Sequence, residues 1–190
     1  MKININFLGR GFVVAVFFCC FSFVANAQEV FTSQNGKIKF VSEAPLELIK
    51  AESNKLVSVI DVNKRSFAFS VLVETFEGFN SPLQKEHFRE NYMETTKFKS
   101  ATFKGKIIEE VDLTKEGIYA VRAKGMLDIH GVSKEKIIKG KITVRNGSVE
   151  LEAEFDVPLD EQNIKVPKVV NQKIAQTIRV SVKGTLLPKK

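Results

Sequence analysis

Cysteine is absent after residue 20, because the 190-residue chain contains only two cysteines, Cys19 and Cys20. Both fall in an N-terminal segment that we expect to be removed, so the mature chain can form no disulfide, thiolate metal site or cysteine nucleophile. Histidine is equally scarce: His87 and His130 lie far apart, without the short ligand spacing of a zinc site. We therefore predict no metal and no other cofactor.

The chain also lacks the motifs of common enzyme classes. Residues 131–135, Gly-Val-Ser-Lys-Glu, have no second glycine of a nucleophile elbow, and residues 139–143, Lys-Gly-Lys-Ile-Thr, are no phosphate loop. Glu150, Glu152 and Glu154 alternate with apolar residues, which places their carboxylates on the wet face of a strand. We predict that the protein is not an enzyme and has no catalytic residues.

The first 27 residues have the three parts of a secretory signal peptide. Lys2 and Arg10 are basic, residues 11–24 are apolar apart from Ser22, and Ala25-Asn26-Ala27 is a small-x-small cleavage site. The alternative is a membrane anchor, which needs roughly 20 apolar residues, and this run is shorter. We predict cleavage after Ala27, a mature domain over residues 28–190, and a periplasmic or secreted location.

The composition of that mature segment indicates one domain. It has no internal repeat, low-complexity tract or Gly/Ser linker. Its net charge is +5, since the chain as a whole carries +7 and the signal removes two basic residues and no acidic one. The basic residues are spread along the chain, which does not suggest a nucleic-acid partner and favours peripheral contact with anionic envelope surfaces.

The dominant hydrophobic period is two, which is typical of strands with one dry face. In residues 66–74, for example, Phe67, Phe69 and Val71 alternate with smaller or more polar residues. About eight segments are predicted to be strands: residues 37–44, 56–62, 66–74, 101–107, 119–129, 138–144, 149–157 and 174–186.

Two local signals complete this pattern. Asn146-Gly147 tolerates the positive φ angles of a type I′ hairpin turn between two strands. Ser81-Pro82-Leu83-Gln84 is a capping box with proline at the first helical position, which predicts one short helix to about Asn91. We predict an all-β, closed antiparallel barrel with this helix near its mouth, because closure removes exposed strand edges. A β-sandwich is the alternative.

Several motifs resemble the signatures of a known family. Residues 79–88, Phe-Asn-Ser-Pro-Leu-Gln-Lys-Glu-His-Phe, with residues 92–95 and 101–105, resemble the central signature of the YceI-like family. Residues 125–134, Gly-Met-Leu-Asp-Ile-His-Gly-Val-Ser-Lys, resemble its second signature. Residues 164–175 are similar to members from Bacteroidetes-type bacteria. The resemblance implies a lipocalin-like barrel of eight strands in a secreted or periplasmic protein, and some members hold a long isoprenoid amphiphile inside it.

This resemblance, together with alternation, predicts which side chains line the barrel lumen. Eight are expected there: Phe67, Phe69, Val71, Phe103, Tyr119, Leu127, Phe155 and Ile178. Three more are expected on the helix at the barrel mouth: Leu83, His87 and Phe88. His130 is expected in a turn between two strands.

Two functions are open at this point, and for a third, a hydrolase or isomerase acting on a bound lipid, no nucleophile–base pair can be named. One is a carrier for a long-chain amphiphile such as a polyprenyl, quinone or fatty acyl lipid. For a tail of about ten carbons, the free energy of burial only just offsets the cost of association, since burial contributes about 0.8 kcal/mol per CH₂ and association costs about 4 to 15 kcal/mol. The other is a secreted structural or interaction module with a solid barrel, because barrels of about eight strands either fill with side chains or hold one small ligand.

Overall fold

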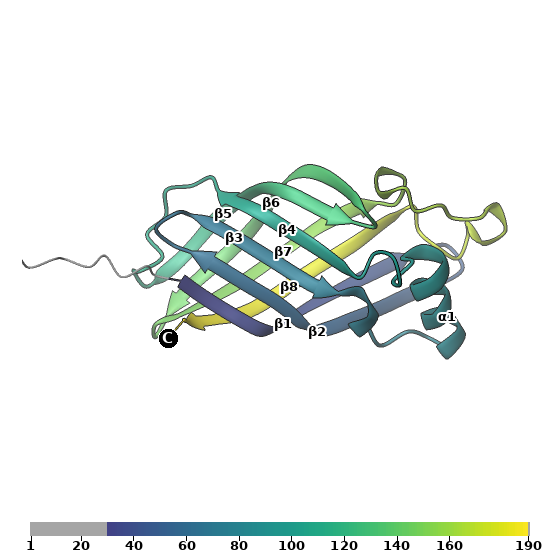
Figure 1. Ribbon diagram of the computed structural model, residues 1–190, viewed down its shortest axis with the longest axis horizontal. Coiled ribbons are helices and arrows are strands. Elements are labelled where there is room, and N and C mark those ends of the chain that lie inside the picture. The colour runs from purple at the N-terminus through teal and green to yellow at the C-terminus, as the bar shows by residue number, and fades with distance from the viewer. Residues whose placement is uncertain (1–29, 190) are drawn as a thin grey trace, which may run out of the picture.

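The computed structural model describes residues 30–189, which form one closed antiparallel barrel (Figure 1). Each strand pairs with its neighbours in the sequence, and β1 also pairs with β8. This closure confirms the predicted eight-stranded barrel and excludes the sandwich. The strands are β1 (Val30–Glu43), β2 (Leu48–Asp61), β3 (Ser66–Leu72), β4 (Ser100–Ile107), β5 (Gly117–Ile129), β6 (Val132–Arg145), β7 (Ser148–Pro158) and β8 (Thr177–Pro188).

Several strand boundaries differ from those predicted. β2 begins at Leu48 instead of residue 56, because its first half turns Ala51 and Ser53 inward and therefore lacks a strong hydrophobic alternation. β1 likewise begins earlier, at residue 30. β8 begins at Thr177, after a connecting segment that contains Ile174. The predicted signal peptide, residues 1–27, lies outside the described residues.

Two tight hairpin turns connect β5, β6 and β7. Asn146 and Gly147 have φ angles of 50° and 68°, which confirms the predicted turn between β6 and β7. His130 and Gly131 have φ angles of 53° and 72° and form a matching turn between β5 and β6. Positive φ at both central residues defines the type I′ turn, whose twist suits paired strands.

The barrel is solid at the end where the described chain begins and ends. The Lys189 amide donates to the Val30 carbonyl there, and Figure 1 places the C-terminus at that end. Phe31, Val149 and Leu186 are at most 3% exposed and belong to one core cluster with residues of β2 to β6. Burial of each such side chain contributes roughly 1.5 to 3 kcal/mol, so this cluster anchors the fold.

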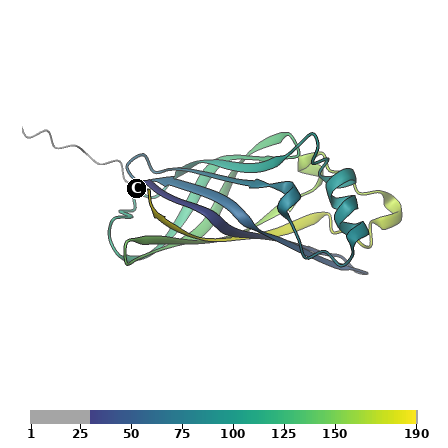
Figure 2. The same ribbon diagram turned by 60° about the horizontal axis from the view of Figure 1, so that its bottom comes forward.

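The other end carries the helical segments. Helix α1 (Pro82–His87) continues into a π-helical turn, η2 (Phe88–Tyr92), and together they lie across this end of the barrel (Figure 2). The connection from β7 to β8 lies at the same end (Figure 1) and contains the short 3-10 turns η3 (Asp160–Gln162) and η4 (Lys168–Val170). None of the helices within residues 30–189 has the length and apolar character needed to cross a membrane.

Candidate binding site

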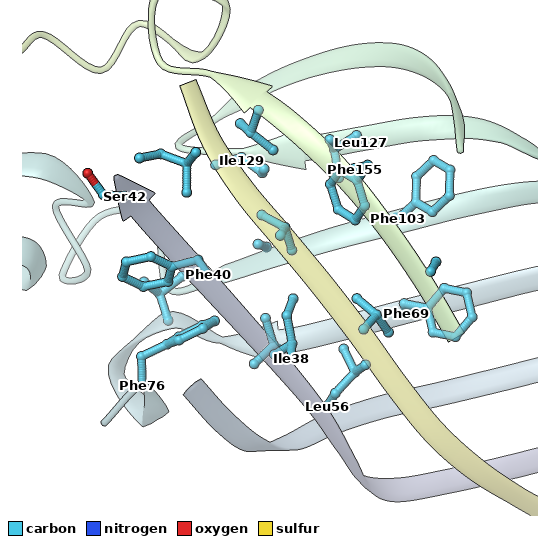
Figure 3. Close-up of a pocket in the computed structure, with 18 of the residues that line it drawn as sticks. Ile38, Phe40, Ser42, Leu56, Phe69, Phe76, Phe103, Leu127, Ile129 and Phe155 are labelled. Carbon is cyan, nitrogen blue, oxygen red and sulfur yellow. The ribbon is translucent and has the colours of Figure 1, made fainter. Parts of the chain in front are cut away.

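A cavity of about 590 Å³ occupies the barrel on the side of the helical end. Side chains from different strands point into it, among them Ile38 and Phe40 of β1, Phe103 of β4 and Phe155 of β7 (Figure 3). Its size falls in the range of pockets that take small organic ligands, about 300 to 1,000 Å³. On this side, the lumen is therefore not filled by the protein's own side chains.

Phenylalanine rings form part of the inner wall of the cavity. The Phe67 ring lies 4.9 Å from that of Phe103 and 5.5 Å from that of Phe69, centroid to centroid. These residues come from paired positions of β3 and β4, where Phe69 lies opposite Phe103 and Phe67 opposite Gly105. All three rings line the cavity. They present a rigid apolar surface whose faces can pack against a hydrocarbon chain.

A second aromatic cluster lies at the mouth of the cavity. Phe88 of η2 stacks on Phe40 of β1 at 5.3 Å, and Phe79 lies 5.0 Å from Phe88. Phe76, which follows the short 3-10 turn η1 (Val73–Thr75), completes the cluster at 5.5 Å from Phe40. These contacts pack η2 against the rim of the barrel, so η2 forms one wall of the cavity mouth.

Hydrogen bonds fix where α1 begins. The Gln84 backbone amide donates to Ser81 Oγ, and Gln84 Oε1 accepts from the backbone amide of Asn80. A standard capping box would use the backbone amide of Ser81 itself, one residue later. The Gln84 side-chain amide also donates to Glu47 in the turn between β1 and β2. The Asn80 side chain donates to the carbonyl of Leu48. The predicted capping box therefore also joins the helix to the neighbouring hairpin.

Most residues predicted to face the lumen do line the cavity: Phe67, Phe69, Val71, Phe103, Leu127, Phe155 and Ile178. The cavity does not reach Tyr119, the remaining one. Its ring packs against the core cluster of the solid end, and its hydroxyl donates to the Lys115 carbonyl. Alternation places Tyr119 on the correct face of β5, but its position near the strand's start puts it below the cavity floor.

The three residues predicted at the barrel mouth, Leu83, His87 and Phe88, all line the cavity opening. Sequence reasoning missed Phe40, Phe76 and Phe79. The alternation of Ile38, Phe40 and Ser42 was a usable signal for Phe40. Phe76 and Phe79 lie in an irregular segment, where no period could have assigned them to a face.

Polar groups near the cavity lie mainly on the segments of its mouth. Glu47, Gln84, His87 and Lys173 line it from the β1–β2 turn, α1 and the β7–β8 connection. Tyr92, in η2, also lines the cavity, and burial raises the pKa of its phenol. Residues 30–189 contain no group of three or more His, Cys, Asp or Glu side chains arranged to hold a metal ion. The site thus combines an apolar interior with a polar opening.

Residues 20–186 match the YceI-like domain. The chain belongs to the YceI-like family. Its fold is similar to that of a polyisoprenoid-binding domain from Saccharophagus degradans, with a TM-score of 0.72, 13% identity, and coverage of 85% of this chain and 99% of that one. For Burkholderia cenocepacia BcnA the TM-score is 0.65 at 12% identity, and the match covers 80% of this chain and 95% of that one. For the YCEI protein of Campylobacter jejuni the TM-score is 0.55 at 11% identity, and the match covers 99% of this chain and 94% of that one. No curated protein matches the chain.

In this YceI-like chain, the segment that resembles the second family signature, residues 125–134, contributes His130, which contacts the segments around the cavity mouth from outside the cavity. His130, expected only as a turn residue, has a side chain that is 10% exposed. Its Nδ1 lies 3.1 Å from the Gln162 carbonyl of η3, and its Nε2 lies 2.7 Å from the Glu94 carboxylate. The Phe98 ring packs edge-on against the imidazole at 4.6 Å. His130 therefore joins three separate connections at the helical end of the barrel.

Proposed function

We propose that this protein is a non-catalytic carrier that holds a long-chain, isoprenoid-like amphiphile in the barrel cavity. The observation that carries the proposal is the apolar cavity of about 590 Å³ with a polar mouth. Support also comes from membership of the YceI-like family and from the fold shared with the polyisoprenoid-binding domain of Saccharophagus degradans. A hollow lumen argues against the alternative of a solid interaction module.

The volume of the cavity bounds the length of chain it can hold. At about 30 Å³ for each non-hydrogen atom, the share of a water molecule in the liquid, the cavity takes about 20 such atoms. That corresponds to about four isoprene units. Burial of about 20 carbons at about 0.8 kcal/mol each exceeds the cost of association, about 4 to 15 kcal/mol. A polyprenyl, quinone or long fatty acyl tail meets this requirement, with any polar head at the mouth.

We also propose that the carrier acts outside the cytoplasm, in the periplasm or as a secreted protein. The support is the tripartite N-terminal segment with its Ala25-Asn26-Ala27 site. Mass spectrometry of the chain from its own host should find Gln28 at the N-terminus. An N-terminal Met1 would contradict export, and a lipid on Cys19 or Cys20 would contradict the start at Gln28 and a soluble carrier.

The binding proposal is tested by stripping the protein through unfolding and refolding and then melting it with candidate amphiphiles. Polyprenyl phosphates, quinones and long fatty acids are tested in turn. A ligand at 100 times its dissociation constant adds about 2.7 kcal/mol of stability. For a domain of this size, the Tm should then rise by about 5 to 10 °C.

Two alanines of β5 provide a matched pair of variants. Ala123 lines the cavity, whereas Ala120 is exposed on the outer wall. Ala123→Phe should fill part of the cavity and reduce the ligand-dependent rise in Tm, while Ala120→Phe should preserve it. The proposal fails if no compound raises the Tm of the wild type and protein extracted from its host carries no stoichiometric lipid.

A further inference from the structure

Exposed apolar side chains surround the cavity mouth on three separate segments. Leu46 in the β1–β2 turn is 66% exposed, Leu83 in α1 is 58% exposed, and Val169 in η4 is 91% exposed. The Leu46 amide donates to the carbonyl of Gln172, which joins the first of these segments to the third. The Gln84–Glu47 hydrogen bond joins the first to the second. We call Leu46, Leu83 and Val169 the apolar rim.

The apolar rim is continuous with the opening of the cavity. Leu83 itself lines the cavity, and so do Glu47 and Val170, the neighbours of Leu46 and Val169 in the sequence. All three segments lie at the helical end of the barrel in Figures 1 and 2. A surface that meets the rim would therefore face the cavity opening directly.

Charge around the mouth is concentrated on one of these segments. Residues 164–176 contain Lys165, Lys168 and Lys173 and no acidic residue. All three lysines are exposed, and none forms an ion pair within residues 30–189. The other two segments are balanced: residues 82–92 carry two basic and two acidic residues, and residues 44–50 carry one of each. The basic part of the mouth is thus residues 164–176, which carry Val169. The acidic residues of the β7–β8 connection, Asp160 and Glu161, precede them, and Glu161 pairs with Lys136.

We propose that the cavity mouth docks on an anionic lipid bilayer, with the apolar rim inserted at the headgroup level and the three lysines contacting anionic headgroups. Large apolar side chains exposed together mark an interaction surface. An exposed apolar residue beside a lysine, as Val169 lies beside Lys168, suits the interface of a bilayer, where hydrocarbon and headgroup charge are close together. This inference rests on the proposed carrier function, since docking would open the lumen toward the source of its amphiphile.

Vesicle flotation tests the proposal with the chain that begins at Gln28, which contains the complete closed barrel. The vesicles are phosphatidylcholine alone, or phosphatidylcholine with about one third phosphatidylglycerol. The wild type should float with the anionic vesicles at low ionic strength and much less with the neutral ones. Each lysine near an anionic surface accounts for about a fivefold change in partitioning. Lys165→Glu/Lys168→Glu should therefore lower binding about 25-fold or more.

The outer wall of the barrel offers matched controls. Lys104→Glu/Lys106→Glu makes the same charge change on exposed lysines of β4. Leu46→Asp/Val169→Asp should abolish flotation, whereas Ile118→Asp/Ile137→Asp, at exposed wall positions of β5 and β6, should not. Leu83 and Lys173 are left unchanged because they also line the cavity. The Tm of every variant is measured to confirm that it folds.

Three results would overturn the docking proposal. The wild type could fail to float, or it could float equally with both kinds of vesicle. The third result is that mouth variants and wall variants with unchanged Tm lose flotation to the same extent. The proposed carrier function is measured separately, by the rise in Tm with soluble amphiphiles. Loss of docking with that rise intact would reject the membrane surface alone. Absence of the rise with docking intact would reject the lumen as a lipid site.

Discussion

The His130 imidazole lies between the Glu94 carboxylate and the Gln162 carbonyl, at 2.7 Å and 3.1 Å. Glu94 belongs to the segment after η2, and Gln162 ends η3. One side chain in the β5–β6 turn therefore hydrogen-bonds to both neighbouring connecting segments. His130 and Glu94 both have positive φ angles, 53° and 44°. Such conformations persist only where the surroundings stabilise them, which these hydrogen bonds do.

Replacement of His130 should destabilise the helical end of the barrel. His130→Ala removes two hydrogen bonds and leaves the Gln162 carbonyl without this partner, which should lower the free energy of unfolding by about 2 to 4 kcal/mol. Asn146→Ala is the control, because Asn146 has nearly the same φ, 50°, and is also followed by glycine in a type I′ turn. It should cost only about 1 kcal/mol of backbone strain. Equal losses in urea unfolding would show that the His130 bonds contribute nothing.

Two glycines in the barrel wall should respond very differently to alanine. At Gly105 in β4, an added Cβ would lie 2.0 Å from the Lys124 carbonyl oxygen and 2.5 Å from Gly125 Cα. Gly105→Ala must therefore push β4 and β5 apart and should cost about 3 kcal/mol or more. At Gly184 in β8, the nearest atom would lie 3.7 Å away, so Gly184→Ala should be neutral or stabilising by up to about 1 kcal/mol. Urea unfolding measures both, and similar effects would contradict the strand contact.

A pair of buried serines in β2 tests the cost of an unpaired hydroxyl. Ser58 is 0% exposed, and its Oγ has no hydrogen-bond partner within the described residues. Ser58→Ala should leave stability unchanged or raise it by about 1 kcal/mol, because an unpaired buried polar group is removed. Ser53, which is 1% exposed, has its Oγ 2.6 Å from Thr75 Oγ1 and accepts from the Lys55 amide. Ser53→Ala should cost about 1 to 3 kcal/mol, and thermal melts showing the reverse order would refute this assignment.

Tyr92 should report on the environment of the cavity mouth. The chain has two tyrosines and no tryptophan, so ionisation can be followed by ultraviolet absorbance. Burial raises the pKa of Tyr92, so its phenol should deprotonate above the ordinary range for tyrosine. Because the folded state disfavours the phenolate, its stability should fall as the pH rises from the ordinary tyrosine pKa toward the raised one.

Tyr92→Phe provides the control for this titration. It should remove the late ionisation phase and reduce the loss of stability at high pH. An amphiphile that fills the cavity to the mouth should raise the pKa of Tyr92 further by excluding water. A late phase that survives in Tyr92→Phe would contradict the assignment.

The barrel could be predicted from the sequence because its signals are local. Alternation in β3 assigned Phe67, Phe69 and Val71 to one face, since successive side chains of a strand point to opposite sides. Asn146-Gly147 and the Ser81 cap specified a turn and a helix start through backbone geometry within a few residues. These features depend on neighbours in the chain, so the sequence alone was sufficient for the all-β class and for most of the lumen lining.

The cavity and its mouth depend on contacts between residues that are distant in the sequence. Alternation predicts the same inward face for Tyr119 and Leu127, yet only Leu127 lines the cavity, because the solid core fills the barrel at the start of β5. Phe40 and Phe88 come together only when the barrel closes beneath η2. The sequence determined which side chains face inward, and tertiary structure decided where they meet and where space remains, because strand register and closure set the distances across the lumen.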